Sequence, residues 1–131
     1  TEKYLREVTI PALERGRAKA GKTMEGFEIM GPSFVVTGNN DEELEAAATG
    51  TRQQIAFYGS TPAYRNVLEI HGRGGIDDEI LNTFAVVGAP EDIAPELSQR
   101  YGDVIQRISF YAPYASDPDR WAAVMAALQA A

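Results

Sequence analysis

Cysteine is absent from the 131-residue sequence, and histidine and tryptophan each occur only once. Without cysteine the chain can form no disulfide, no thiolate nucleophile and no cysteine-ligated metal site. One histidine is too few to build a zinc site from imidazoles, so we expect no metal site. No apolar run approaches the roughly 18 residues of a membrane span, and no signal-peptide pattern opens the sequence. We therefore expect a cytoplasmic protein without membrane association.

Positive charge is also scarce, with 12 Lys and Arg against 19 Asp and Glu and a net charge of −7. The main basic cluster, Arg15 to Lys22, falls at the end of a predicted helix, where cations suit the helix dipole. Nucleic-acid binding needs a basic patch, so we expect no nucleic-acid partner. The balance of 44% hydrophobic and 24% charged residues is typical of one small globular domain.

The first half of the chain predicts a helix, a strand and a second helix. The first helix covers about 2–20, and Pro11 should kink it because proline lacks a backbone donor. A strand at about 27–37 is rich in β-branched and aromatic residues. The next helix begins at Asn40, with Glu43 at capping-box spacing, and ends at Gly59.

The second half predicts a helix that starts with Thr61 as cap and Pro62 at its first position and ends at Gly72. Further elements follow in the order short helix, short apolar run, helix, strand and helix, at about 77–82, 84–87, 90–102, 104–111 and 116–131. Glycines at 72–75 indicate a hinge between the two halves.

Alternating helices and strands favour an α/β fold with parallel strands. Only the strands at 27–37 and 104–111 are strongly indicated. A parallel sheet is normally covered on both faces, and open strand edges promote association. Two strands therefore call for cover from another polypeptide, another copy or a further part of the same chain.

Phe57–Arg65, reading FYGSTPAYR, is the segment richest in chemically useful side chains. Its hydroxyls and Arg65 surround a predicted helix start, which can attract an anion or a polar ligand. Ordinary capping, with tyrosines packed on a core, explains the same residues. His71 on an apolar helix face is either a packed, hydrogen-bonded histidine or a pocket residue. The acids at 77–79 are typical of helix capping. Residues 88–91 indicate either a plain helix start or a ligand-facing turn.

Five phrases, in this order, resemble the C-terminal part of luciferase-like oxidoreductases, in particular their deazaflavin-dependent branch. They are YLREVTIPALERGRAKAGK, FEIMGPSFVVTG, RQQIAFYGSTPAYRNVLEIHG, FAVVGAPEDIAPEL and RISFYAPY. IAFYGSTPAYR is the most specific of them, and together they cover essentially the whole chain.

The resemblance implies the C-terminal part of a TIM-like (β/α)8 barrel, so that 1–131 is a single, partial domain. The strands at 27–37 and 104–111 look like barrel strands seven and eight. Active sites lie at the C-terminal ends of barrel strands, which places 37–40 and 111–114 at the mouth. Relatives tend to carry a longer insertion near 72–76, so we expect either a loop deletion or a chain break there.

The implied function is that of a fragment of a flavin- or deazaflavin-dependent oxidoreductase, whose cofactor is the deazaflavin coenzyme F-420 or FMN. Family members are usually dimeric and act on small molecules. The resemblance places catalytic and most cofactor contacts in the other half of the barrel, so neither is assigned here. The substrate-side candidates are Tyr58, Tyr64, Arg65, His71 and Tyr114.

We therefore expect the chain alone to be inactive and to bind no flavin tightly. We also expect it to form a homo-oligomer or to associate with the missing half of the barrel. The alternative is a non-catalytic α/β module that assembles through its exposed strand edges.

Overall fold

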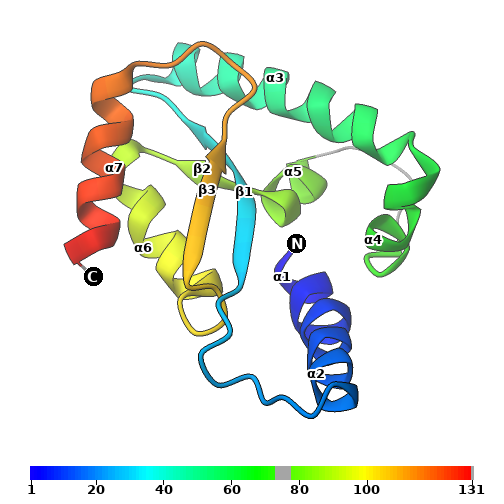
Figure 1. Cartoon of the computed structure of the whole chain (residues 1–131). Coiled ribbons are helices and arrows are strands. Elements are labelled where there is room, and N and C mark those ends of the chain that lie inside the picture. The colour runs from blue at the N-terminus through cyan, green and yellow to red at the C-terminus, as the bar shows by residue number, and fades with distance from the viewer. Residues whose placement is uncertain (73–77, 131) are drawn as a thin grey trace.

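The computed structural model describes residues 1–72 and 78–130 (Figure 1). The predicted hinge at 72–75 and the predicted loop deletion or break near 72–76 fall, apart from Gly72, outside the described residues. Among the residues that are described, no helix is long and apolar enough to cross a membrane.

The first helix consists of three consecutive segments: α1 (Glu2–Tyr4), the π-helical turn η1 (Leu5–Thr9) and α2 (Ile10–Lys19). The Ile10 amide donates to the Leu5 carbonyl, five residues back, immediately before Pro11. Proline offers no amide and crowds the preceding turn, so the helix widens there. The predicted disturbance at Pro11 is confirmed as a π turn.

β1 (Met30–Thr37) leads through a tight turn into α3 (Asp41–Gly59). Asn40 caps α3 by accepting a hydrogen bond from the Glu43 amide at 2.9 Å, as its sequence position predicts. The Glu43 carboxylate accepts in return from the amide of Asn39 rather than that of Asn40, at 3.0 Å. Any side chain at Gly38 would collide with the first turn of α3, so glycine lets the helix start directly beside the strand end.

The predicted helix at 61–72 starts as expected, with Thr61 at the cap position and Pro62 at the first position, but it is wrong in its length, and Thr61 makes no capping hydrogen bond. The segment forms a short 3₁₀ turn, η2 (Pro62–Tyr64), followed by α4 (Arg65–Glu69). The hydroxyls of Ser60 and Thr61 donate backward to the Phe57 carbonyl, at 2.7 and 3.2 Å. They therefore satisfy the C-terminal end of α3 and do not cap the next helix.

The remaining elements are α5 (Asp78–Phe84), β2 (Ala85–Gly88), α6 (Pro90–Tyr101), β3 (Arg107–Tyr111) and α7 (Pro118–Ala130). The weakly indicated apolar run thus forms a third strand. The strand predicted from residue 104 begins later, because the amides of Val104 and Ile105 still donate to the Tyr101 carbonyl at the end of α6. Pro95 lies inside α6 without ending it.

The three strands form a parallel sheet in the order β2-β1-β3. β1 pairs through its second half with β2, and through its first half with β3. Val36 packs with residues of α3 and α5, whereas Val35 packs with residues of α6 and α7. Because neighbouring strand residues point to opposite faces, helices cover both faces of the central strand (Figure 1).

This arrangement confirms the α/β prediction and its parallel strands. The two strongly indicated strands, β1 and β3, pair directly with each other. In a TIM barrel the helices lie outside and the inner strand faces meet one another. In this structure both faces of β1 pack against helices, so the described chain forms an open three-layer unit.

Candidate functional site

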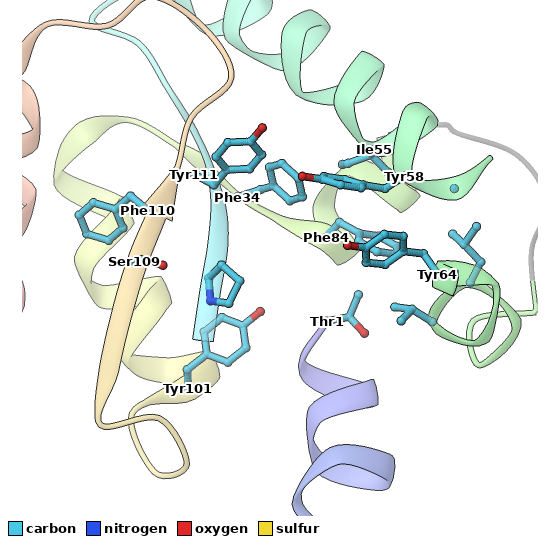
Figure 2. A pocket seen from close by; sticks show the side chains of 14 residues that line it. Thr1, Phe34, Ile55, Tyr58, Tyr64, Phe84, Tyr101, Ser109, Phe110 and Tyr111 are labelled. Carbon is cyan, nitrogen blue, oxygen red and sulfur yellow. The ribbon is translucent and has the colours of Figure 1, made fainter. Parts of the chain in front are cut away.

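A cavity of about 530 Å³ lies between the β1–β3 side of the sheet and the C-terminal part of α3 (Figure 2). We call it the aromatic pocket. The sheet contributes Pro32, Phe34, Ser109 and Tyr111 to its wall. Tyr101 of α6 closes the lower side in the view of Figure 2.

Strand register and helix periodicity explain how distant segments meet at this pocket. Pro32 pairs with Ser109 and Phe34 pairs with Tyr111, so alternate residues of two strands reach the same cavity. Helical spacing brings Ile55, Tyr58 and Gly59 to one side of α3, and Tyr64, Val67 and Leu68 to one side of η2 and α4.

Four aromatic rings follow one another along the pocket wall in the order Tyr111, Phe34, Tyr58 and Tyr64. Their successive ring centroids are 5.1, 6.3 and 5.0 Å apart, and each pair is tilted. Tilted contacts at these distances contribute roughly 0.5–1.5 kcal/mol each beyond area burial. The row is therefore a semi-rigid surface on which a flat ligand could lie.

Tyrosine hydroxyls supply most of the polar groups in the pocket. The nearby Tyr58 hydroxyl raises the pKa of Tyr111. Burial raises the pKa of Tyr101. Both tyrosines therefore stay protonated at neutral pH and can donate hydrogen bonds. No charged side chain belongs to the lining of this pocket among the described residues.

His71 lies beside the pocket, in the turn after α4. Its Nε2 is 2.8 Å from the Thr1 hydroxyl, and its ring centroid is 5.9 Å from that of Phe84. Thr1 and Phe84 both line the pocket, whereas His71 does not. Burial lowers the pKa of His71, which favours the neutral ring. Of the two interpretations of His71, the structure supports the packed, hydrogen-bonded histidine.

The other four predicted site residues divide into two groups. Tyr58 and Tyr64 line the aromatic pocket, as a ligand role requires. Arg65 is exposed and belongs to no cavity wall in the described part of the chain. Tyr114 lies in a different place, where its hydroxyl donates to the Val35 carbonyl at 2.8 Å and accepts from the Thr37 amide at 3.2 Å.

Tyr114 belongs to a polar group at the C-terminal end of β1, which we call the strand-end cluster: Thr37, Glu43, Tyr114 and Arg120. The buried Arg120 guanidinium donates to the Thr37 carbonyl at 3.3 Å and to the Glu43 carboxylate at 2.5 Å. Within the described part of the chain, Thr37 Oγ1 and Arg120 Nε have no hydrogen-bond partner. Burial raises the pKa of Tyr114. The cluster uses most of its polar atoms to tie α3, α7 and the strand end together.

Sequence reasoning missed several pocket residues, among them Phe34, Phe84, Tyr101 and Ser109. The alternation in RISFY does place Ser109 and Tyr111 on one face of β3. Nothing in the sequence says that α3 leaves this face uncovered, because that depends on how the helix crosses the sheet.

Comparison with known proteins agrees with these observations. Two mycobacterial relatives, the uncharacterized proteins Mb1395 of Mycobacterium bovis and Rv1360 of Mycobacterium tuberculosis, are each 45% identical over 128 residues. The match includes 82% of this chain but only 38% of each relative, so the chain spans well under half their length. No solved structure matches the chain significantly. The sequence model of the luciferase-like monooxygenase family matches residues 1–107, and the chain therefore belongs to that family.

Proposed function

We propose that this chain forms the substrate-side wall of a flavin- or deazaflavin-dependent oxidoreductase of the luciferase-like family. The aromatic pocket carries the proposal, because Tyr58 and Tyr64, both from the family-like phrase, line it together. Pockets that bind small molecules are mostly apolar with a few well-placed polar groups, and this one has that character. In this role Tyr58, Tyr64 and Tyr111 orient the substrate, and the apolar wall excludes water from it.

The cofactor fits only in part. A flat ring could lie along the aromatic row, but coenzyme F-420 and FMN also carry phosphate groups. No Lys or Arg side chain lines the aromatic pocket in the described structure. Phosphate binding usually relies on such cations or on amides at a helix start. The pocket thus lacks what a phosphorylated tail needs, and we assign no cofactor contact to it.

The proposed setting is a barrel in which β1 and β3 act as strands seven and eight. Their direct pairing supports this setting, as does the short span of the chain relative to its relatives. The helices on both faces of β1 and the pairing of β2 with its other edge differ from a barrel. In that setting the remaining barrel strands and the cofactor site come from the region that the relatives have beyond the part matched by this chain.

Fluorescence titration with coenzyme F-420 and with FMN tests the proposal. We expect no submicromolar binding by the 131-residue chain, because its pocket offers no phosphate site. We expect tight binding of one cofactor by a full-length chimera in which this chain replaces the matching region of Mb1395. A folded chimera that binds neither cofactor would overturn the proposed function. Submicromolar binding by the chain alone would overturn the assignment of the cofactor site elsewhere.

A second role, self-association, is favoured by the outer side of β3, which is an edge strand of the described sheet. Beside it lies a groove between β3, α6 and α7, lined in part by Ile108, Met125 and Leu128. Met30 is 68% exposed and Met125 50% exposed at this groove. Open edges with apolar neighbours favour association, so we propose a second copy as the occupant.

Sedimentation at micromolar concentration tests this second role. We expect dimers or larger species from the wild-type chain and a shift toward monomer in the Met125→Lys variant. Gln53→Lys, at an exposed position of α3, also adds one positive charge and is the matched control. A wild-type chain that sediments as a well-folded monomer would exclude self-association at this concentration.

A further inference from the structure

The inference concerns the class of molecule that the aromatic pocket selects, and it rests on the proposed function. Its first basis is the shape of the wall. The row Tyr111, Phe34, Tyr58 and Tyr64 runs along one side, and Figure 2 shows Phe34 between the rings of Tyr111 and Tyr58. Such a row offers ring faces and edges over the length of several fused or linked rings. It matches a flat conjugated molecule better than a flexible chain.

The second basis is the pair of hydroxyls that Tyr58 and Tyr111 bring to the wall of the same pocket. A tyrosine hydroxyl has one proton to donate and two lone pairs to accept. Both side chains line the cavity, so the pair can offer a donor and several lone pairs to a ligand. A carbonyl or hydroxyl oxygen of a ligand can take that donor. An apolar ligand would leave it without a partner.

The third basis is charge. The chain carries a net charge of −7, yet no acidic or basic side chain lines the pocket among the described residues. The neighbouring His71 ring is bonded to the Thr1 hydroxyl instead of facing the cavity as a cation. A charged ligand would lose its hydration here and gain no side-chain counter-ion, which costs several kcal/mol or more. Thr1 does line the pocket, but burial lowers the pKa of its amino group and so favours the uncharged form. A neutral ligand has no such penalty.

From these three observations we infer that the aromatic pocket selects a neutral, flat, conjugated molecule that bears a carbonyl or hydroxyl oxygen. The ring system lies along Phe34 and Tyr64, and the oxygen is bound by the Tyr58–Tyr111 pair. Two sources share this chemistry, namely a substrate of the proposed oxidoreductase and the bare ring of its cofactor. We assign the pocket to the substrate, because it offers no group for the phosphorylated cofactor tail.

The test uses the purified chain without any cofactor and prodan, a neutral fluorescent naphthalene ketone, as the probe. We expect prodan to bind with a blue-shifted emission. The double variant Tyr58→Phe with Tyr111→Phe keeps both rings and removes both hydroxyls. It should bind prodan up to about tenfold more weakly, since one hydrogen bond to the ketone is lost. Tyr4→Phe, at a tyrosine outside the pocket wall, is the matched control and should bind as the wild type does.

Three further probes separate the parts of the inference. Dimethylaminonaphthalene, the same ring system without the ketone, should bind equally to the wild-type chain and to the double variant. The anionic probe anilinonaphthalenesulfonate should compete poorly with prodan. Lumichrome, a bare flavin-type ring without a phosphate, shares the inferred chemistry and should displace prodan, whereas FMN, which carries the phosphate, should not displace it at equal concentration.

Several results would overturn the inference: no binding of prodan, an equal loss for the ketone-free probe, stronger binding of the anionic probe, or displacement by FMN. Circular dichroism of each variant shows whether it is folded, and ketone selectivity is compared only among folded variants. Prodan binding needs no cofactor, so it can fail while the chimera still binds coenzyme F-420 or FMN. If prodan binds as expected but the folded chimera binds neither cofactor, only the proposed function is contradicted.

Discussion

The strand-end cluster and the aromatic pocket are both rich in polar side chains, yet their polar atoms serve different ends. In the cluster, Tyr114 and Arg120 form hydrogen bonds with the backbone of β1 and with Glu43. In the pocket, Tyr58 and Tyr111 line a cavity. A tyrosine bonded to a strand backbone holds the fold, whereas a tyrosine on a cavity wall can offer its hydroxyl to a ligand.

This difference corrects the position of Tyr114 among the candidates. Its place at the C-terminal end of the sheet resembles that of an active-site residue in a barrel. Its hydroxyl, however, bridges Val35 and Thr37 of the central strand. The comparison therefore predicts that substitutions in the cluster alter stability, and that substitutions in the pocket alter binding.

The largest stability effect is expected for Tyr114→Phe. The change leaves the Val35 carbonyl and the Thr37 amide without their side-chain partner. We expect a loss of about 1–3 kcal/mol in the free energy of unfolding, measured by urea denaturation. Tyr111→Phe is the control and should change the unfolding free energy by less than about 0.5 kcal/mol. Equal effects of the two substitutions would erase the distinction between cluster and pocket.

Arg120→Met should have the next largest effect. The Arg120 side chain is only 6% exposed, and its loss leaves the Thr37 carbonyl unpaired, whereas Glu43 is 44% exposed and can be hydrated. We expect a cost of about 1–2 kcal/mol, since solvent screens the Glu43 side of the pair. Arg107→Met, which removes the more exposed pair with Glu28, is the control and should cost about 0.5 kcal/mol or less. A smaller loss at Arg120 than at Arg107 would contradict the structural role of the cluster.

The cluster should also make stability depend on pH at the acidic end. The hydrogen bond from the Asn39 amide, followed by the charge of Arg120, lowers the pKa of Glu43 from its ordinary value near 4.5. A carboxylate with a lowered pKa stabilises the fold above its unfolded pKa, and this contribution disappears as the pH falls through the folded pKa. Melting temperatures between pH 6 and pH 3 should fall more steeply in the wild type than in Glu43→Gln. Parallel curves would show that the carboxylate charge is unimportant here.

The smallest effect is expected beside the pocket, at His71. Burial lowers its pKa from about 6.5, so the folded chain binds fewer protons there than the unfolded chain does. Stability from this residue is complete above pH 6.5 and declines as the pH falls through the folded pKa. His71→Gln keeps a polar partner for Thr1 and removes the titration. The melting temperature should therefore fall slightly more between pH 7.5 and pH 5.5 in the wild type than in His71→Gln. A larger fall in the variant would contradict this expectation.

Local sequence signals predicted the elements well, because each depends on a few neighbouring residues. Asn40 with Glu43 marked the start of α3, and Pro11 marked a disturbed helix. The failures share a different cause. Thr61 has the sequence of a cap, but its hydroxyl is taken by the Phe57 carbonyl at the end of the preceding helix.

The aromatic pocket was only half predictable. Tyr58 and Tyr64 stand in one phrase, so the sequence pointed to them together. Phe34 and Tyr111 join them through strand register, and Tyr101 joins them through the end of α6. These contacts depend on how the helices cross the sheet, and that crossing cannot be read directly from a single sequence.

The position of β1 at the centre of the sheet has a consequence for synthesis on the ribosome. β1 is made first among the strands, but its partners in 85–88 and 107–111 leave the ribosome much later. Until Tyr111 has emerged, β1 lacks at least one of its two neighbouring strands. The missing hydrogen bonds lie either along FVV at 34–36 or along the residues before it. A nascent chain in this state exposes an apolar strand with open edges, which favours aggregation and chaperone binding. Translation that pauses between β1 and β3 should therefore lower the yield of folded protein more than a pause after β3.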